Sequence, residues 1–283
     1  MKESVPVLIE EKENIERGEN IRTRIVILRQ AQARDEKYGF DVENPADITE
    51  QGREDAINFA RNYSRDRDLK SQPFIRHARN PYRPDEEMFN PGKNAEHAAS
   101  ETAKILDNVF KETIESQDER SVRSRVGLLP KQKHSLGYWD NFMDVYNKSK
   151  ESGKNPADAL SDAVIFYVED SYNKESDENT TPLKEVAARI IESITKIIRA
   201  TKKFKSNTDT EVFMISFDAM LDGAIKLLLD KYQEEEDKKG LSIQELGGPI
   251  KNMEPLFIDV FRKNKDEYAV ELTYRNIKTN LNI

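Results

Sequence analysis

Two polar segments follow the most apolar stretches of the chain, and they are where chemistry is expected. Arg29 and Gln30 follow the run Ile25-Val26-Ile27-Leu28, and Ser216-Phe217-Asp218 ends the run that begins at Val212. In open α/β sheets, ligands bind in the crevice beyond the carboxyl ends of the strands. If both runs are strands of one sheet, these two strand ends form the candidate site.

Few residue types in this chain can carry covalent or metal chemistry. The sequence has 283 residues, with no cysteine and three histidines. The absence of cysteine excludes disulfides, thiolate zinc sites and cysteine nucleophiles. Three histidines leave little for a His-rich metal centre. We therefore expect neither a metal nor a cofactor.

The charge balance and the apolar pattern restrict the partners. The chain has 45 Lys and Arg against 53 Asp and Glu, a formal net charge of −8, which argues against a phosphate-tracking surface for nucleic acid. No uninterrupted apolar stretch approaches the roughly 18 residues that span a bilayer. Residues 1–20 carry scattered charges where a signal peptide needs an apolar centre. These features predict a cytoplasmic protein with no nucleic-acid or membrane partner, and they leave the oligomeric state open.

Strands and helices alternate along most of the chain. The β-branched run at 25–28 and the apolar run at 212–217 predict buried strands, and Phe74-Ile75 predicts a short one. Residues 256–262 and 268–275 predict an antiparallel hairpin. This pattern predicts a three-layer α/β/α sandwich with a mixed, mostly parallel central sheet. We expect residues 1–20 to form a charged arm and residues 21–283 to form one domain.

The predicted helices follow from apolar residues at helical spacing. One helix begins after Thr49, a good N-cap residue, and a proline-initiated helix follows Thr181-Pro182. Between positions 80 and 94, four residues argue against regular structure, and this segment is predicted to be a loop insertion: Pro81, Pro84, Pro91 and Gly92. The other predicted helices span residues 95–115, 138–150, 156–172 and 221–229.

Several motifs in this order resemble one known family. The chain reads IVILRQAQA at 25–33, DITEQGREDA at 47–56, Thr102-Ala103, LGYWDNF at 136–142 and MISFDAMLDGAIKLLL at 214–229. These segments resemble the histidine phosphatase superfamily, also called phosphoglycerate-mutase-like, over residues 22–275. In that family the first strand runs into an Arg-His pair, and a segment Leu-Thr-x-x-Gly-x-x-x-Ala follows. The resemblance implies a phosphoglycerate-mutase-like fold and phosphatase chemistry.

The two histidines that this chemistry requires are absent. As the resemblance implies it, the first-strand histidine is the nucleophile that forms a phosphohistidine, and a second histidine with two arginines stabilises the phosphoryl oxygens. The nucleophile position matches Gln30, whose amide nitrogen is not nucleophilic at neutral pH. The second histidine position matches Phe217, which neither donates a hydrogen bond nor carries charge.

The phosphate-binding arginines that the resemblance implies are Arg29 and Arg83. Arg29 matches the first of them, and bidentate contact with phosphate suits a guanidinium; the alternative is a strand-end arginine paired with a carboxylate. Arg83 lies in Asn80-Pro81-Tyr82-Arg83, which resembles the start of the segment that carries the second arginine. The alternative for Arg83 is an arginine on a surface loop.

Two further residues are candidates for the site. His77 follows a predicted strand near the crevice mouth and is the one histidine that could replace the missing nucleophile; otherwise it is an exposed strand-end residue. Asp218 could accept a hydrogen bond in the site or cap the following helix, and capping is favoured. His97 and His134 are expected to be ordinary surface or half-buried residues.

These residues favour a pseudophosphatase that keeps the fold and part of a phosphate pocket for binding or regulation. Its expected partner is a phosphorylated small molecule or a phosphoprotein. One alternative is an active phosphomonoesterase with a non-standard nucleophile, such as His77. The other is a structural protein-interaction module in which Phe217 and its neighbours fill the old crevice.

Overall fold

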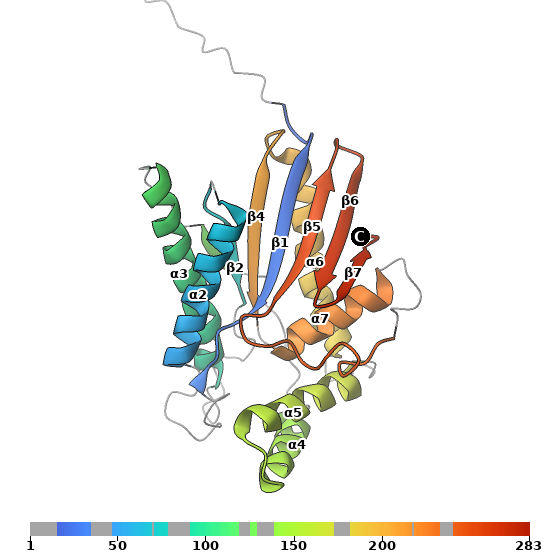
Figure 1. Ribbon diagram of the computed structural model, residues 1–283. Coiled ribbons are helices and arrows are strands. Elements are labelled where there is room, and N and C mark those ends of the chain that lie inside the picture. The colour runs from blue at the N-terminus through green and yellow to red at the C-terminus, as the bar shows by residue number, and fades with distance from the viewer. Residues whose placement is uncertain are drawn as a thin grey trace, which may run out of the picture.

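The computed structural model describes residues 16–34, 47–69, 71–78, 91–118, 125–128, 139–172, 182–216, 218–232 and 240–283. These residues form a seven-stranded sheet in the order β3-β2-β4-β1-β5-β6-β7. Helices lie on both sides of the sheet (Figure 1). The strands are β1 (Ile21–Arg29), β2 (Phe74–His77), β3 (Val126–Leu128), β4 (Asp209–Ser216), β5 (Pro255–Arg262), β6 (Tyr268–Tyr274) and β7 (Ile277–Asn280). The helices are α2 (Glu50–Arg67), α3 (Pro91–Asp118), α4 (Trp139–Glu151), α5 (Pro156–Ser171), α6 (Leu183–Ala200), the short 3₁₀ helix η2 (Thr201–Lys203) and α7 (Asp218–Lys231).

The sheet has a parallel half and an antiparallel half that meet at β1. Strands β3, β2, β4 and β1 are parallel neighbours, whereas β5, β6 and β7 are each antiparallel to the strand before them in the sheet. The run Ile25 to Leu28 is fully buried on both sides, as a central strand requires. The predicted mixed sheet and the hairpin of β5 and β6 are confirmed, but the sheet has three parallel and three antiparallel pairs of neighbours and so is not mostly parallel. The short final strand β7 was not predicted from the sequence.

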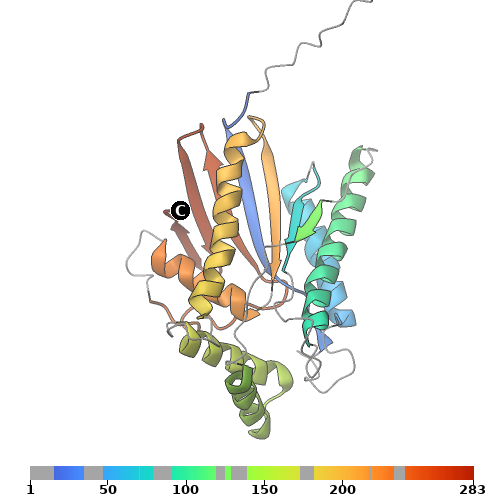
Figure 2. The ribbon, with the colours of Figure 1, turned by 180° about the vertical axis from the view of Figure 1, so that it is seen from behind.

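Two apolar clusters fill the spaces on either side of the sheet. Val26 and Leu28 face α2 and α3, whereas Ile25 and Ile27 face the cluster that contains α5, α6 and α7. Figure 2 shows α6 lying along this second face. The period of two along β1 thus separates the layers. The predicted three-layer α/β/α sandwich is confirmed.

Helix starts follow the local chemistry of the sequence. The Thr49 hydroxyl accepts a hydrogen bond from the backbone nitrogen of Gly52, which confirms it as the N-cap of α2. The prediction of a loop up to residue 94 is wrong at its end, since α3 begins at Pro91. Proline suits a first helical position because its missing N–H would have no partner there. The rest of that predicted loop, residues 80–90, lies outside the described residues.

The helices α4 and α5 form a hairpin beyond the carboxyl ends of β1 and β4 (Figures 1 and 2). Phe142 and Tyr167 pack edge to face within this hairpin, with ring centroids 6.3 Å apart. Both belong to the cluster that α6 and α7 share. None of the helices in the described ranges is long and apolar enough to cross a membrane.

A charged cluster lies on the α2 side of the sheet, away from the strands' carboxyl ends. We call it the amino-side cluster, and it consists of Arg24, Asp259, Glu211, Tyr63 and Arg67. Arg24 is flanked in register by Glu211 on β4 and Asp259 on β5. It binds both oxygens of Asp259 at 2.7 Å. Tyr63 donates to Glu211 at 2.5 Å, and Arg67 donates to its other oxygen at 2.9 Å. Each charge in this cluster therefore has an internal partner.

Candidate functional site

The two strand ends selected from the sequence lie side by side. Arg29 is the last residue of β1, and its partner in register is Ser216, the last residue of β4. The backbone nitrogen of Gln30 donates to the carbonyl of Ser216 at 3.0 Å, so the two chains stay together beyond the strands. We call Arg29, Gln30 and Ser216 the carboxyl-end site. The structure thus brings together the described residues of the two predicted strand ends.

Arg29 is buried and holds a backbone carbonyl. Its side chain is on the α7 side of the sheet, because it alternates with the residues of β1 that face α2. Its Nη1 donates to the carbonyl of Ile250 at 2.8 Å. Neither sequence interpretation, a phosphate ligand or a paired carboxylate, anticipated this carbonyl. The contact fixes the position of a guanidinium at a strand end, where a cation can face an anionic ligand.

Gln30 and Ser216 bring buried polar atoms to the same strand ends. Gln30 is 6% exposed and Ser216 is 1% exposed. Gln30 Oε1 and Ser216 Oγ have no hydrogen-bond partner within the described part of the chain. Buried polar groups are normally paired, and an unpaired one in a native structure calls for a ligand, a water or a functional role. Rotation of the Gln30 amide about its last bond can present either its oxygen or its NH₂ group.

The segment after the site is held by the motif at 47–56. The backbone nitrogen of Thr49 donates to the carbonyl of Gln32 at 2.9 Å. A Cβ at Gly52 would lie 2.6 Å from that same carbonyl oxygen, so only glycine lets α2 approach so closely. On the other side, Thr102 Oγ1 accepts from the backbone nitrogen of Ala31 at 3.0 Å. The glycine and the threonine of the two motifs therefore fix the chain that leaves Gln30.

His77 lies on the other face of the sheet from Arg29. It pairs in register with Ile215, and along β2 it shares a face with Ile75. Ile75 and Ile215 belong to the cluster against α2 and α3, whereas Arg29 is on the α7 side. His77 is buried, and its Nδ1 lies 3.2 Å from the carbonyl of Ala78. The expectation of an exposed histidine is wrong, and β2 does not direct this imidazole toward Arg29.

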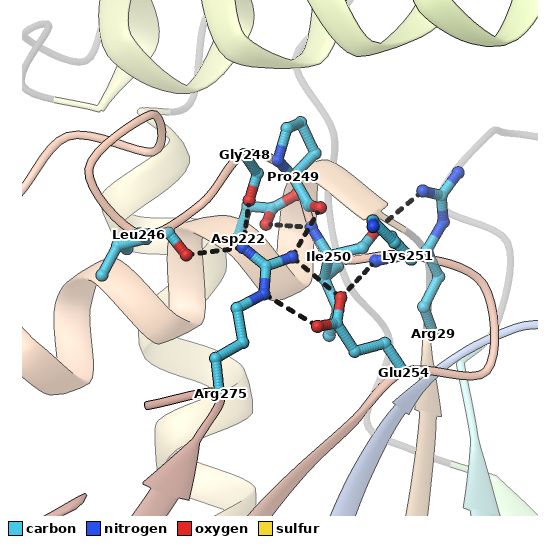
Figure 3. Close-up of polar contacts among 9 residues, drawn as sticks. All are labelled: Arg29, Asp222, Leu246, Gly248, Pro249, Ile250, Lys251, Glu254 and Arg275. Carbon is cyan, nitrogen blue, oxygen red and sulfur yellow. Dashed lines mark hydrogen bonds and ion pairs between the residues drawn. The ribbon is translucent and has the colours of Figure 1, made fainter. Parts of the chain in front are cut away.

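The loop between α7 and β5 covers the carboxyl-end site, and sequence reasoning missed its role. Asn252 Nδ2 donates to the carbonyl of Gln30 at 3.1 Å. The backbone nitrogen of Met253 donates to the carbonyl of Arg29 at 3.2 Å. Figure 3 shows the loop as it passes Arg29 and Arg275. Gly247-Gly248, both at positive φ, was a visible signal of a turn, but not of what the turn contacts.

The electrostatics of this loop depend on one ion pair. Arg275 donates to both carboxylate oxygens of Glu254, at 2.7 and 2.8 Å. Burial by itself would raise the pKa of Glu254, but the hydrogen bonds from Arg275 and from the backbone of Lys251 outweigh it and lower the pKa. The hydrogen bond to Glu254 in turn raises the pKa of Arg275. Glu254 is therefore a carboxylate at neutral pH.

Several predicted site residues lie outside the described residues. They are Arg83, Phe217 and His134, and the side chains of His97 and Asp218. Asp218 is the first residue of α7. In the part of the chain that the structure describes, no three His, Asp or Glu side chains gather as a metal site.

Comparisons with known proteins place the fold. No protein-family model matches the chain, and no curated protein matches it. Among solved structures, mycobacterial hydrolase 1 matches with a TM-score of 0.51 and 17% identity, over 90% of this chain and 99% of the other. Native mycobacterial glucosyl-3-phosphoglycerate phosphatase gives a TM-score of 0.49 with 14% identity, over 90% and 99% of the two chains. Mycobacterial hydrolase 2 gives 0.48 with 15% identity, over 93% of each chain.

At these identities the likeness shows the fold alone, and the predicted phosphoglycerate-mutase-like sandwich is confirmed.

Proposed function

We propose that this chain is a pseudophosphatase: it binds a phosphorylated ligand at the carboxyl-end site and does not hydrolyse it. The observation that carries the proposal is the make-up of that site. Arg29 supplies a buried guanidinium, and its neighbours at the strand ends are Gln30 in sequence and Ser216 in register. Their buried atoms, Gln30 Oε1 and Ser216 Oγ, have no partner among the described residues. A cation and neutral hydrogen-bonding groups suit phosphate oxygens.

The same residues argue against turnover. Covalent phosphoryl transfer needs an activated nucleophile within reach of the phosphorus. Gln30 offers an amide, and His77 is on the opposite face of the sheet from Arg29. We expect that restoring chemistry requires Gln30→His and Phe217→His together, because one supplies the nucleophile and the other a donor for the transferring group.

Two measurements on the same preparations test the proposal. The first is hydrolysis of an aryl phosphate between pH 4 and 9, and the second is calorimetric titration with inorganic phosphate. We expect no turnover above the Arg29→Ala variant and saturable phosphate binding that this variant loses. Binding to the folded state alone also raises the melting temperature.

The results that would contradict the pseudophosphatase proposal can be told apart. Turnover that disappears in Arg29→Ala would contradict the proposal and favour an active phosphohydrolase, and loss of that turnover in His77→Ala would identify its nucleophile. An absence of both turnover and phosphate binding would favour the structural interaction module. If binding is seen, phosphorylated small molecules and phosphopeptides can be compared as competitors of phosphate.

A further inference from the structure

The turn between β6 and β7 carries an arginine whose every N–H group is used. Arg275 donates five hydrogen bonds (Figure 3). Two reach Glu254, and three reach the backbone carbonyls of Leu246 at 2.5 Å, Gly248 at 2.8 Å and Pro249 at 3.0 Å. A guanidinium has five N–H groups, so none is left over. Arg275 thus ties both ends of the loop 246–254 to one point.

The shape of this loop depends on that attachment. Gly247 has φ of 91°, and Met253 has φ of 56° although it carries a side chain. A Cβ at Gly247 would lie 2.9 Å from Arg275 Nη1. Left-handed backbone is unfavourable for a residue such as Met253 and persists only where neighbouring contacts hold it. The loop is therefore a backbone arrangement that the guanidinium of Arg275 organises.

The loop transmits this arrangement to the carboxyl-end site through Ile250. The fully buried Ile250 is held at both backbone groups: its nitrogen donates to Asp222 Oδ1 at 2.9 Å, and its carbonyl accepts from Arg29 Nη1 at 2.8 Å. Met253 and Asn252 bind the carbonyls of Arg29 and Gln30. The position of the Arg29 guanidinium is thus set by a loop whose conformation is set by Arg275.

We propose that Arg275 is a positioning residue for phosphate binding: by holding the loop 246–254 it places the Ile250 carbonyl that orients the Arg29 guanidinium. The inference rests on the proposed function, since the ligand is the phosphate assigned there to Arg29. Arg275 itself need not contact the ligand. The segment 246–254, which directly precedes β5, is therefore part of the phosphate-binding site in this proposal.

The test is a double-mutant cycle read by phosphate affinity. Arg275→Lys keeps the charge and loses the fork that reaches three carbonyls and a carboxylate. We expect it to weaken inorganic phosphate binding about tenfold when Arg29 is present, which corresponds to about 1.4 kcal/mol. In the Arg29→Lys background the same substitution should change affinity by less than about twofold, because coupled residues are not additive.

A matched control is available at the other end of the sheet. Arg24 also forms a bidentate pair with a buried carboxylate, that of Asp259. Arg24→Lys is expected to lower stability and to leave the phosphate dissociation constant unchanged. If Arg275→Lys does not fold, Glu254→Gln removes the ion pair with a smaller change of shape. Equal losses of affinity with and without the Arg29 substitution would overturn the proposal.

A second readout separates this inference from the proposed function. The Nε–H group of Arg29 can be followed by NMR in protein labelled at arginine nitrogens. If the wild-type chain binds no phosphate, the proposed function fails, and hydrogen exchange at Arg29 Nε still tests the positioning. We expect faster exchange in Arg275→Lys than in Arg24→Lys. Equal exchange rates in the two variants would show that Arg275 does not position Arg29.

Discussion

The amino-side cluster and the carboxyl-end site differ in whether their polar atoms have partners among the described residues. In the amino-side cluster, Arg24 pairs with Asp259, and Glu211 is bound by both Tyr63 and Arg67. In the carboxyl-end site, Gln30 Oε1 and Ser216 Oγ are equally buried but have no partner among the described residues. Charge and burial alone therefore do not identify a functional site. What distinguishes the amino-side cluster from the carboxyl-end site is whether partners within the described residues satisfy their polar atoms. The contrast concerns these two groups of residues, since Thr23 Oγ1, next to Arg24, is also buried without a partner among the described residues.

The largest loss of stability is expected in the amino-side cluster, where each charged side chain has a partner. Arg24→Ala leaves Asp259, which is 5% exposed, as a buried carboxylate without its guanidinium. Loss of one partner of a buried pair costs about 3–5 kcal/mol. Urea unfolding should therefore show a large drop in the free energy of unfolding. A loss below about 1 kcal/mol, the range of an exposed pair, would remove the basis of the comparison.

A smaller loss of stability is expected from removing the hydrogen bond between Thr102 and the backbone of Ala31. Thr102→Val keeps the shape of the side chain but removes the acceptor of the Ala31 backbone nitrogen. A buried donor left unsatisfied costs about 1–3 kcal/mol. The same unfolding measurement applies, with Thr113→Val as the control, because Thr113 Oγ1 donates to the carbonyl of Val109 within its own helix. Equal effects of the two substitutions would contradict the assigned role of Thr102.

A substitution in the carboxyl-end site is expected to change stability in the opposite direction. Ser216→Ala removes a buried hydroxyl that has no partner in the described residues, so the free energy of unfolding should stay constant or rise by up to about 1 kcal/mol. The same substitution should weaken phosphate binding if this end is the site. Destabilisation by Ser216→Ala would mean that the hydroxyl is already satisfied, and the two ends would then be alike.

The smallest effect is a difference in pH dependence. Burial raises the pKa of Glu211, against the hydrogen bonds from Tyr63 and Arg67. Its contribution to stability is therefore full below the unfolded value of about 4.3 and is lost as the pH rises through the raised pKa. The lowered pKa of Glu254 acts in reverse: its contribution is present above about 4.3 and is lost as the pH falls through the lowered pKa.

Unfolding curves between pH 3 and 7 can separate these contributions. The stability difference between the wild type and Glu254→Gln should shrink as the pH falls. Relative to the wild type, Glu211→Gln should be more favourable at pH 7 than at pH 3. Differences that do not change with pH would show that the two carboxyl groups are not perturbed in opposite directions.

Short-range patterns predicted the elements of this fold well. The run Ile25 to Leu28, the N-cap Thr49 and the hairpin after Leu256 each have a local signal, and each is confirmed. The four residues of β7 lack such a signal, because Ile277 to Asn280 contains little apolar patterning and pairs only as an edge. Pro91 misled because proline both ends helices and begins them.

The candidate site could be predicted as a location but not as a set of contacts. The carboxyl ends of β1 and β4 follow from the strand pattern, so the positions of Arg29 and Ser216 could be predicted from the sequence. The carbonyl of Ile250 and the side chain of Arg275 could not be predicted in the same way, because they belong to a loop and a turn far away along the chain. Arg29 and Ile250, for example, are separated by 221 residues. The face of His77 depended on the exact register of β2.

The position of β1 in the sheet also determines when the chain can fold. Both neighbours of β1 come late in the sequence: Arg24 and Asp259 are separated by 235 residues. During synthesis from the N-terminus, the apolar run of β1 has both edges unpaired until β4 and β5 have been made. Such long-range pairing makes folding slow, and exposed strand edges favour aggregation. We therefore expect nascent chains that stop before β5 to need a chaperone. The burial of β1 depends on β5, which lies in the last quarter of this sequence.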